Sequence, residues 1–238
     1  MVYKREDGRA FDETRKVEAK VGIIKRADGS AMFSFGGSKA IAAVYGPRQL
    51  HPQHLQKPEK GLLRCYYDML SFSVTERKKP GPSRRSSEIS FVTTKSLEPV
   101  LQLDQFPNTV IDVYIMILQA DASTRCAGIN AASMALANAG LEMTELVTAV
   151  SMGKIGDAIV ADLTKEEEDF SITKDGEEIK AATDIPMAFL SRSGKISLLQ
   201  LDGKIKQEEL KEAMAVAKKV CKKIEEIQKN AIKKINED

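Results

Sequence analysis

The sequence predicts an α+β fold made of two similar strand-and-helix halves, with mixed, largely antiparallel sheets. Three features lead to this prediction: short strand-like runs near the N-terminus, an alanine-rich helical stretch in the middle, and further strands before a long amphipathic C-terminal stretch. Strands followed by helices, twice over, indicate an α+β arrangement. We expect a single domain over residues 1–238, with internal halves of approximately 10–140 and 141–238.

The first half begins with strands. Residues 16–47 contain three strand-like runs separated by the turn sequences ADGS and GGS, which predicts a hairpin followed by a third strand. Residues 51–60 are polar and contain two prolines, so we expect an exposed loop there. A strand at 64–74, a helix at 86–101 and a nearly all-apolar strand at 109–118 complete this half before its last helix.

That last helix is predicted to follow Arg125 and to end near Gly140, because apolar side chains recur between them at three- and four-residue spacing. A short helix or turn is expected at 142–146. Strands are then predicted at 147–152, 158–163, 185–190 and 195–201. The chain closes with an amphipathic helix over 207–235, whose apolar residues lie on one stripe.

Composition narrows the class of protein. The chain is 42% hydrophobic and 29% charged, no window approaches a membrane span, and the N-terminus is too polar for a signal peptide, so we expect a soluble cytoplasmic protein. Cys65, Cys126 and Cys221 form no CxxC pair, which predicts reduced, mostly buried thiols. The net charge of +2 is too small to indicate nucleic-acid binding by itself, but residues 75–85 are strongly basic and residues 165–169 strongly acidic.

Three polar residues, Ser123, Thr124 and Arg125, lie at or near the start of the alanine-rich helix. A helix N-terminus presents unpaired N–H groups and the positive end of its dipole, so two hydroxyls and a guanidinium there would form an anion site, with phosphate the obvious ligand. The alternative is that a hydroxyl caps the helix and the arginine is an ordinary surface or ion-pairing residue. This stretch alone leaves both interpretations open.

Several long segments together resemble a known family. They include RCYYDMLSFSVTERKKPGPSRRSSEIS, FPNTVIDVYIMILQADASTRCAGINAASMALANAG and LLQLDGKIKQEEL. In order and over nearly the whole chain, they resemble the catalytic RNase PH-like subunit of the archaeal exosome. The resemblance implies an RNase PH-like fold and a phosphorolytic 3′-to-5′ exoribonuclease acting on single-stranded RNA. It also implies a hexameric ring in which active subunits alternate with an inactive RNase PH-like partner, and RNA-binding cap subunits.

The resemblance assigns roles to three groups of residues. Ser123, Thr124 and Arg125 match the segment that binds inorganic phosphate, although the family usually has glycine where this chain has Ser123. The loop at 46–60 matches the one that lines the narrow entrance of the ring, where the family often has arginine in place of Gln53. The residues expected to contact RNA are Arg84, Arg85, Arg77, Lys78 and His51.

The family also carries two catalytic aspartates. Asp184 matches the second, but the first matches either Glu168 or Asp169, because this chain has an extra acid and about nine additional residues before Asp184. Asp175 and Gly176 form a hairpin turn signal, which predicts two paired strands on either side.

Pairing Lys174 with Glu177 sets the register of that hairpin and, if the strands continue, places Glu167 opposite Asp184. Side chains alternate between faces, so Asp169 would then lie diagonally from Asp184 while Glu168 points away. We therefore predict Asp169 and Asp184 as the catalytic pair, a choice that a one-residue bulge would reverse.

The chemistry requires acids, because the departing ribose 3′ oxygen needs a proton or a metal ion. The same two carboxylates, Asp169 and Asp184, are the expected ligands of Mg²⁺, and inorganic phosphate is the expected co-substrate. The products would be nucleoside diphosphates, and the reaction should be reversible. The alternatives are a non-catalytic RNA-binding subunit of the same ring and a free-standing RNase PH that trims transfer RNA ends.

Overall fold

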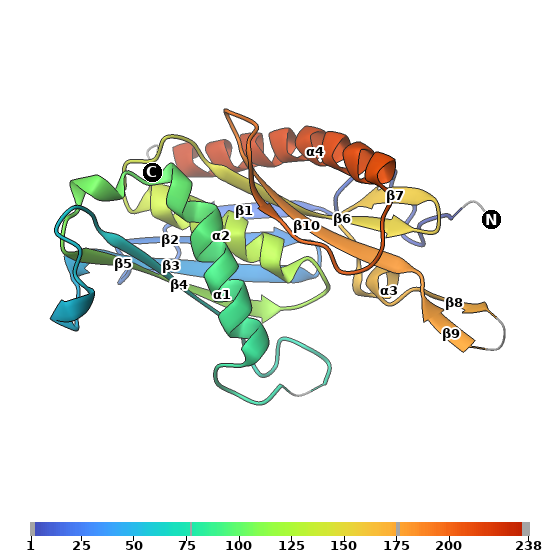
Figure 1. The fold of residues 1–238 in the computed structure, drawn as a ribbon, viewed down its shortest axis with the longest axis horizontal. Helices are drawn as coiled ribbons and strands as arrows, with labels where there is room; N and C mark the ends of the chain where they lie inside the picture. Colours follow the sequence, from blue (N-terminus) through green and yellow to red (C-terminus); the bar gives the residue numbers. More distant parts are fainter. Residues whose placement is uncertain (1–2, 77, 175–176, 235–238) are drawn as a thin grey trace.

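The protein folds as two β-sheets with the long helices between them (Figure 1). The computed structural model describes residues 3–76, 78–174 and 177–234, and only the backbone at 172–174 and 177–180. Helix α1 (Arg84–Leu97) contacts both sheets, as do the central helix α2 (Thr124–Asn138) and the C-terminal helix α4 (Gln207–Lys234). Each half therefore supplies one sheet, and the helices join the two.

The first sheet has the strand order β1-β2-β3-β5-β4. All neighbours are antiparallel except β4 and β5, which run parallel because α1 provides the crossover between them. This confirms the predicted mixed, largely antiparallel arrangement. Its strands are β1 (Val17–Val21), β2 (Gly29–Phe35), β3 (Ser38–Gln49), β4 (Leu62–Met69) and β5 (Thr109–Gln119), and β4 ends five residues before the predicted end of its strand at residue 74. Single 3₁₀ turns occur at η1 (Gln53–Leu55), η2 (Glu98–Val100) and η3 (Leu103–Gln105).

The second sheet has the order β11-β10-β6-β7 and is antiparallel throughout. Its strands are β6 (Val147–Ile155), β7 (Ala158–Ala161), β10 (Ala182–Leu190) and β11 (Ile196–Leu199). A separate two-stranded hairpin, β8 (Ser171–Lys174) and β9 (Glu177–Lys180), projects from the end of the molecule beside the short helix α3 (Lys165–Glu168) (Figure 1). The halves thus share a sheet-and-helix plan but differ in strand number.

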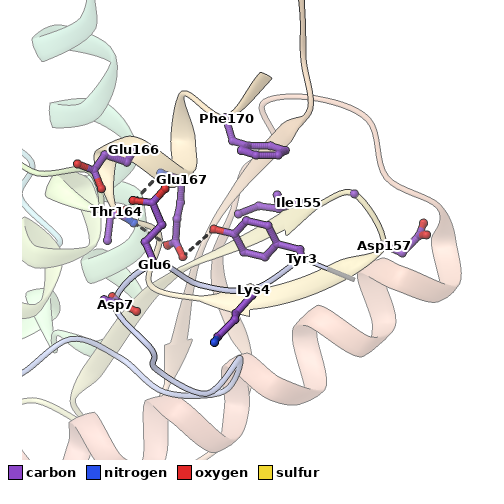
Figure 2. Close-up of a pocket in the computed structure, with 11 residues that line it drawn as sticks. Tyr3, Lys4, Glu6, Asp7, Ile155, Asp157, Thr164, Glu166, Glu167 and Phe170 are labelled. Atoms are coloured by element: carbon purple, nitrogen blue, oxygen red, sulfur yellow. Dashed lines mark hydrogen bonds between the residues drawn. The ribbon is translucent and has the colours of Figure 1, made fainter. Parts of the chain in front are cut away.

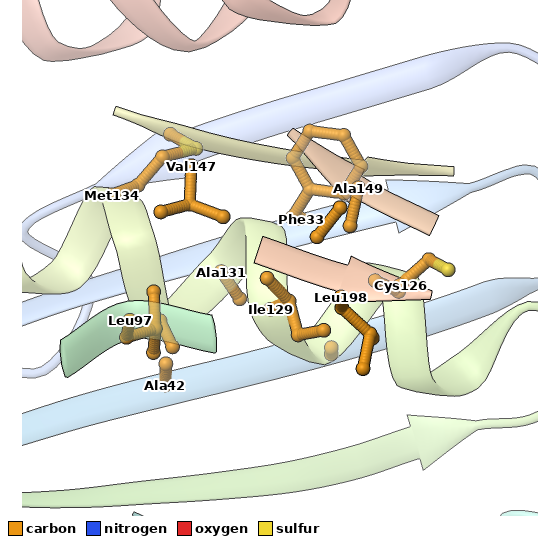
Figure 3. Packing of buried hydrophobic residues seen from close by; sticks show 14 of the residues in the cluster. Phe33, Ala42, Leu97, Cys126, Ile129, Ala131, Met134, Val147, Ala149 and Leu198 are labelled. Carbon is orange, nitrogen blue, oxygen red and sulfur yellow. The ribbon is translucent and has the colours of Figure 1, made fainter. Parts of the chain in front are cut away.

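Helix α2 lies at the centre because its residues are small. Nearly every one of its side chains is buried, and Figure 3 shows Ile129 and Met134 packed between residues of the two sheets. The close approach needs glycine on the facing strand: a Cβ at Gly29 would lie 2.3 Å from the Ala135 carbonyl oxygen. Contact on all sides holds α2 firmly, so its N-terminus has a fixed position between the sheets.

The prediction that the hairpin strand continues back through residues 165–169 is wrong. The hairpin register is as predicted, with Lys174 paired to Glu177, although the turn itself, Asp175 and Gly176, lies outside the described residues. The strands end at Ser171 and Lys180, one further hydrogen bond joins the Ala181 N–H to the Phe170 carbonyl oxygen, and residues 165–168 form α3 instead of continuing the strand. Thr164 caps this helix in a reciprocal pair of hydrogen bonds with Glu167, which therefore does not lie opposite Asp184.

The three cysteines are buried and unpaired, as expected. Burial raises the pKa of the Cys65 and Cys221 thiols to about 12 and that of Cys126 well above its usual value. They are therefore unreactive as thiolates. None of the helices in the described part of the chain is long and apolar enough to cross a membrane.

Candidate active site

The start of α2 opens into a small cavity formed by both halves of the chain. The first half supplies α1 and the loop that enters α2, called the phosphate loop below (residues 120–125). The second half supplies α3, β6 and β10. The residues that line the cavity are Arg85, Ala122, Ser123, Thr124, Arg125, Cys126, Ser151, Glu168, Asp184 and Pro186. The structure therefore brings together the predicted phosphate residues, one RNA-contact arginine and Asp184.

Ser123 does not cap α2, although it occupies the N-cap position. Its backbone is left-handed, with φ 50° and ψ 16°, and its hydroxyl makes no capping hydrogen bond. Instead Ser123 Oγ donates to Asp162 Oδ1 over 2.9 Å. The simple capping interpretation is wrong for this residue, and the N–H groups that open α2 lack a side-chain cap beside the cavity, as an anion site requires.

A serine in this conformation costs about 1–2 kcal/mol relative to a right-handed backbone. The bond to Asp162 offsets about 1 kcal/mol or more of that cost, since the acceptor is charged. The hydrogen bond to Asp162 therefore explains how the chain accommodates Ser123 at a position where the family that it resembles usually has glycine.

Thr124 and Arg125 are each held by neighbours. The buried Tyr67 hydroxyl donates to Thr124 Oγ1 over 3.0 Å. Arg125 donates to Glu88 Oε2 over 3.1 Å and to the Gln200 side-chain oxygen, while Gln200 Nε2 donates to Glu88 over 2.7 Å. The guanidinium is thus fixed in a closed ring of hydrogen bonds at the cavity wall, with only 18% of its side chain exposed.

Asp184 lies on β10, opposite Gly153 of β6. Its Oδ1 accepts a hydrogen bond from the Ser151 hydroxyl. Burial raises the pKa of the Asp184 carboxyl above its usual value, and the negative charge of Glu168 adds to the rise. The hydrogen bond and the positive charge of Arg125 oppose this shift only in part. A raised pKa favours the protonated form of the carboxyl, which is the form that a general acid needs.

Glu168, rather than Asp169, shares the cavity with Asp184. Because residues 165–168 form a helix, Glu168 turns toward the cavity, with its side chain 22% exposed. Asp169 follows the helix with its side chain 58% exposed, and its Oδ1 pairs with Lys165 Nζ over 2.7 Å. The predicted placement of Asp169 beside Asp184 is therefore wrong.

The predicted RNA-contact residues are spread over a long distance. Arg84 and Arg85 open α1 next to the cavity and are exposed. Lys78 is paired with Asp68 and also donates to the Met69 carbonyl oxygen over 3.2 Å, and Arg77 lies outside the described residues.

His51 is exposed, but the structure does not bring it to the cavity. It follows β3, and the opposite end of that strand, Ser38, donates from its hydroxyl to the Ala122 carbonyl oxygen of the phosphate loop. A strand of this length separates the two ends by roughly 35 Å. The loop that contains His51 and Gln53 therefore lies far from the cavity of the same chain.

Two carboxylates, Glu168 and Asp184, are the residues of the cavity that fit a metal ion. No cluster of three or more histidine, cysteine, aspartate or glutamate side chains suited to a metal occurs in the described part of the chain. Hard carboxylate oxygens from only one or two side chains, with phosphate oxygens completing the shell, are the usual way in which proteins hold Mg²⁺. The two carboxylates therefore suit a Mg²⁺ ion whose remaining ligands come from outside the protein.

A larger cavity, of about 500 Å³, lies against another part of α3 (Figure 2). Its walls include Tyr3, Ile155 and Phe170, and the Tyr3 hydroxyl donates to Glu167 Oε1 over 3.2 Å. No residue of the phosphate loop lines this cavity. The larger cavity also has basic, hydroxyl and acidic groups in its walls, but only the smaller of these two contains the uncapped start of α2 together with Arg85 and Arg125. The smaller cavity is therefore the candidate active site.

Sequence reasoning missed several residues that hold the site together. Asp162 and Arg15 form a buried ion pair beside the phosphate loop, Tyr67 holds Thr124, and Glu88 holds Arg125. Their partners are distant in sequence, so periodicity gave no indication of these contacts.

The comparisons with known proteins agree with this geometry. The sequence model described as the 3′ exoribonuclease family, domain 1, matches residues 13–142, and the model of domain 2 matches residues 145–220. The exosome complex component Rrp41 of Pyrococcus furiosus is 51% identical over 230 residues, which cover 97% of this chain and 88% of that protein. The protein of the same name from Methanopyrus kandleri is 48% identical over 229 residues, covering 96% and 92%.

Solved structures show the same fold. The crystal structure of rice Rrp46 superposes with a TM-score of 0.82 at 22% identity, covering 96% of this chain and 100% of that one. A chain of the Archaeoglobus fulgidus exosome with RNA bound to the active site gives a TM-score of 0.77 at 21% identity, covering 94% and 92%. The predicted RNase PH-like fold is confirmed.

Proposed function

Because this chain belongs to the 3′ exoribonuclease family, we propose that the cavity at the start of α2 is the site at which inorganic phosphate cleaves the 3′ end of RNA. The chain is a phosphate-dependent 3′-to-5′ exoribonuclease subunit of an exosome, as its Rrp41 relatives indicate. One observation supports this assignment most strongly: the uncapped α2 N-terminus, Arg125 and two carboxylates all line the same cavity.

Phosphate binding rests on α2 and its neighbours. The N–H groups that open the helix, the Thr124 hydroxyl and the Arg125 guanidinium together offer donors to three or more phosphate oxygens. The ring of hydrogen bonds through Glu88 and Gln200 keeps Arg125 in place before the ligand arrives, so little ordering cost is left at binding.

RNA binding rests on positive charge at the start of α1. Arg84 and Arg85 are exposed there, and Arg85 lines the cavity. Contacts to backbone phosphates give affinity without reading bases, which suits an enzyme that degrades any sequence. The last phosphodiester would then lie between these arginines and the bound inorganic phosphate.

The reaction transfers a nucleotidyl group. An oxygen of inorganic phosphate forms a bond to the phosphorus of the last phosphodiester, and the bond from that phosphorus to the ribose 3′ oxygen of the preceding nucleotide breaks. The released product is a nucleoside diphosphate, and the 3′ oxygen takes a proton to become the new RNA end. Since the phosphodiester bond that breaks is replaced by the phosphoanhydride bond of the diphosphate, its energy is conserved in the product and the reaction runs in reverse when diphosphate is abundant.

Asp184 is the carboxyl best placed to supply that proton, because its pKa is raised by burial and by Glu168. In the alternative role, Glu168 and Asp184 would both be ionised and would hold Mg²⁺, whose charge would then stabilise the departing 3′ oxygen in place of a proton. In this assignment Glu168 takes the place for which Asp169 was predicted.

The relatives are named as components of an exosome complex, and the chain is accordingly expected to work in an assembly with other RNase PH-like subunits. We further propose the alternating six-membered ring and RNA-binding caps that the sequence resemblance implies. In such a ring the distant loop at 46–60 would contact RNA before it reaches the cavity. Native mass spectrometry of this chain mixed with its RNase PH-like partner should give three copies of each subunit.

The test is degradation of end-labelled single-stranded RNA by the assembled complex, in Mg²⁺, with and without inorganic phosphate. We expect stepwise shortening that requires phosphate and disappears in D184A. Binding of RNA without phosphate-dependent shortening would instead support a non-catalytic ring subunit.

A further inference from the structure

A buried ion pair crosses between the two halves of the chain directly beside the candidate active site. Arg15, which precedes β1 in the first half, donates from Nε to Asp162 Oδ2 over 2.9 Å and from Nη2 to Asp162 Oδ1 over 2.7 Å. Its backbone N–H donates to the same carboxylate over 2.9 Å. The Asp162 side chain is fully buried and that of Arg15 is 9% exposed.

The same guanidinium also holds the phosphate loop. Arg15 Nη1 donates to the carbonyl oxygen of Asp121 over 2.6 Å and to its Oδ2 over 2.9 Å. The other carboxylate oxygen of Asp121 accepts from the backbone N–H of Lys165, the first residue of α3, over 3.0 Å. One arginine therefore links the loop that precedes Thr124 to the helix that ends in Glu168.

The link continues on the side of the second half. Asp162 Oδ1, which binds Arg15, also accepts the hydroxyl of Ser123, and Arg15 Nη2 donates to the Leu163 carbonyl oxygen over 3.2 Å. The backbone of Asp162 is left-handed, with φ 54°, a conformation that a non-glycine residue keeps only when its surroundings fix it.

Two glycines make room for this cluster. A Cβ on Gly36 would lie 2.9 Å from Arg15 Cδ, and a Cβ on Gly37 would lie 2.8 Å from Asp121 Oδ2. The turn between β2 and β3 therefore packs tightly against Arg15 and Asp121. Within the cluster the Arg15–Asp162 pair is buried, and its low-dielectric surroundings strengthen the attraction between the two charges.

From these contacts we propose that Arg15 is a positioning residue for phosphorolysis. By binding Asp121 and Asp162 together, it sets the distance between the phosphate donors at Thr124 and Arg125 and the carboxylate of Glu168. A misplacement of about 1 Å in such a site can reduce the rate by about a hundredfold. The inference rests on the proposed function, because it concerns the same cavity.

The test compares R15K with R64K in the full chain assembled with its RNase PH-like partner. Lysine keeps the charge but loses the planar fork, so R15K cannot bind Asp121 and Asp162 at once. Arg64 on β4 makes a similar forked pair with Asp112 on β5, at 2.8 and 3.1 Å. Neither residue lines the cavity, so R64K is the control for an arginine-to-lysine change in a forked pair, although this pair is more exposed. The measurements are the KM for phosphate, the KM for RNA, kcat, and the Kd for inorganic phosphate from ³¹P NMR.

We expect R15K to raise the KM and Kd for phosphate by about tenfold and to lower kcat, while the KM for RNA stays within twofold. R64K should leave all four values within twofold. A folded R15K that binds phosphate like the wild type would overturn the inference while leaving the proposed function intact. A wild-type complex that neither binds phosphate nor needs it for cleavage would overturn both.

A second variant separates positioning from electrostatics and does not rely on R15K folding. Asp121 is 36% exposed, so D121N should fold, and it removes a negative charge close to the phosphate loop. Charge alone predicts tighter phosphate binding in D121N. Positioning predicts binding that is weaker by about threefold or more, because the bridge to Arg15 and Lys165 is disturbed. Tighter binding would overturn the inference.

Discussion

The assignment of Glu168 rather than Asp169 to the active site leads to the sharpest prediction. Asp169 is 58% exposed, and in the described part of the chain its ion pair is with Lys165, which is equally exposed and four residues earlier. Such pairs contribute about 0.3–0.5 kcal/mol to stability. An effect of that size corresponds to about a twofold change in rate at most. We therefore expect D169N to degrade RNA at nearly the wild-type rate.

Glu168 should behave differently, because it shares the cavity with Asp184 and influences the pKa of that carboxyl. Removing an acid–base group or a metal-binding carboxylate costs about a hundredfold or more in rate. E168Q keeps the size of the side chain, so a loss of that magnitude would reflect chemistry and not packing.

The assay is phosphate-dependent shortening of end-labelled RNA under single-turnover conditions, with E168Q and D169N compared side by side in the assembled complex. Circular dichroism spectra should be identical for both variants and the wild type. A hundredfold loss of rate in D169N, with little change in E168Q, would refute the assignment of Glu168. It would instead support Asp169, which the hairpin register predicted from the sequence.

Three further predictions concern Asp184, Arg125 and Arg5. The raised pKa of Asp184 means that its ionised form destabilises the folded chain, so D184N should raise the melting temperature at pH 7. This gain should vanish as the pH falls through the raised pKa to about 4, where the carboxyl is protonated in both the folded and the unfolded chain. An equal gain at all pH values in thermal melts would contradict the prediction. R125K should raise the KM for phosphate by about tenfold without weakening RNA binding, since lysine cannot keep the forked contacts with Glu88 and Gln200. An unchanged KM would count against phosphate binding by this residue. R5A should lower the free energy of unfolding by about 3 kcal/mol, because it removes the forked guanidinium that binds the buried Glu167 carboxylate, with Arg9 Nη2 remaining 3.9 Å away. A loss below 1 kcal/mol in urea denaturation would show that the pair is not important for stability.

Much of the fold could be predicted from sequence, because turn glycines and hydrophobic periodicity mark local structure directly. The strands at β1 to β3 and the helices α1, α2 and α4 were all located in this way. Helix α3 was missed although its capping pattern, Thr164 followed three residues later by Glu167, is visible in the sequence. The hairpin register was correct, but extending it beyond Ser171 ignored that pattern.

The site was only partly predictable. Ser123, Thr124 and Arg125 could be proposed because a helix start and a family resemblance coincide there. Arg15 and Asp162 could not, because they are 147 residues apart and meet only when the two halves pack. A left-handed backbone at a residue such as Asp162 has no clear mark in the sequence. Contacts of this kind depend on tertiary structure, which periodicity does not describe.

The most direct test of phosphorolysis at this cavity follows the atoms of inorganic phosphate. The assembled complex is incubated with unlabelled RNA and ³²P-phosphate in Mg²⁺, and the nucleotide products are separated by thin-layer chromatography. Attack by phosphate predicts that the label appears in nucleoside diphosphates, at a rate that falls at least a hundredfold in both D184N and E168Q. Unlabelled nucleoside monophosphates, released at the same rate without phosphate, would contradict the account.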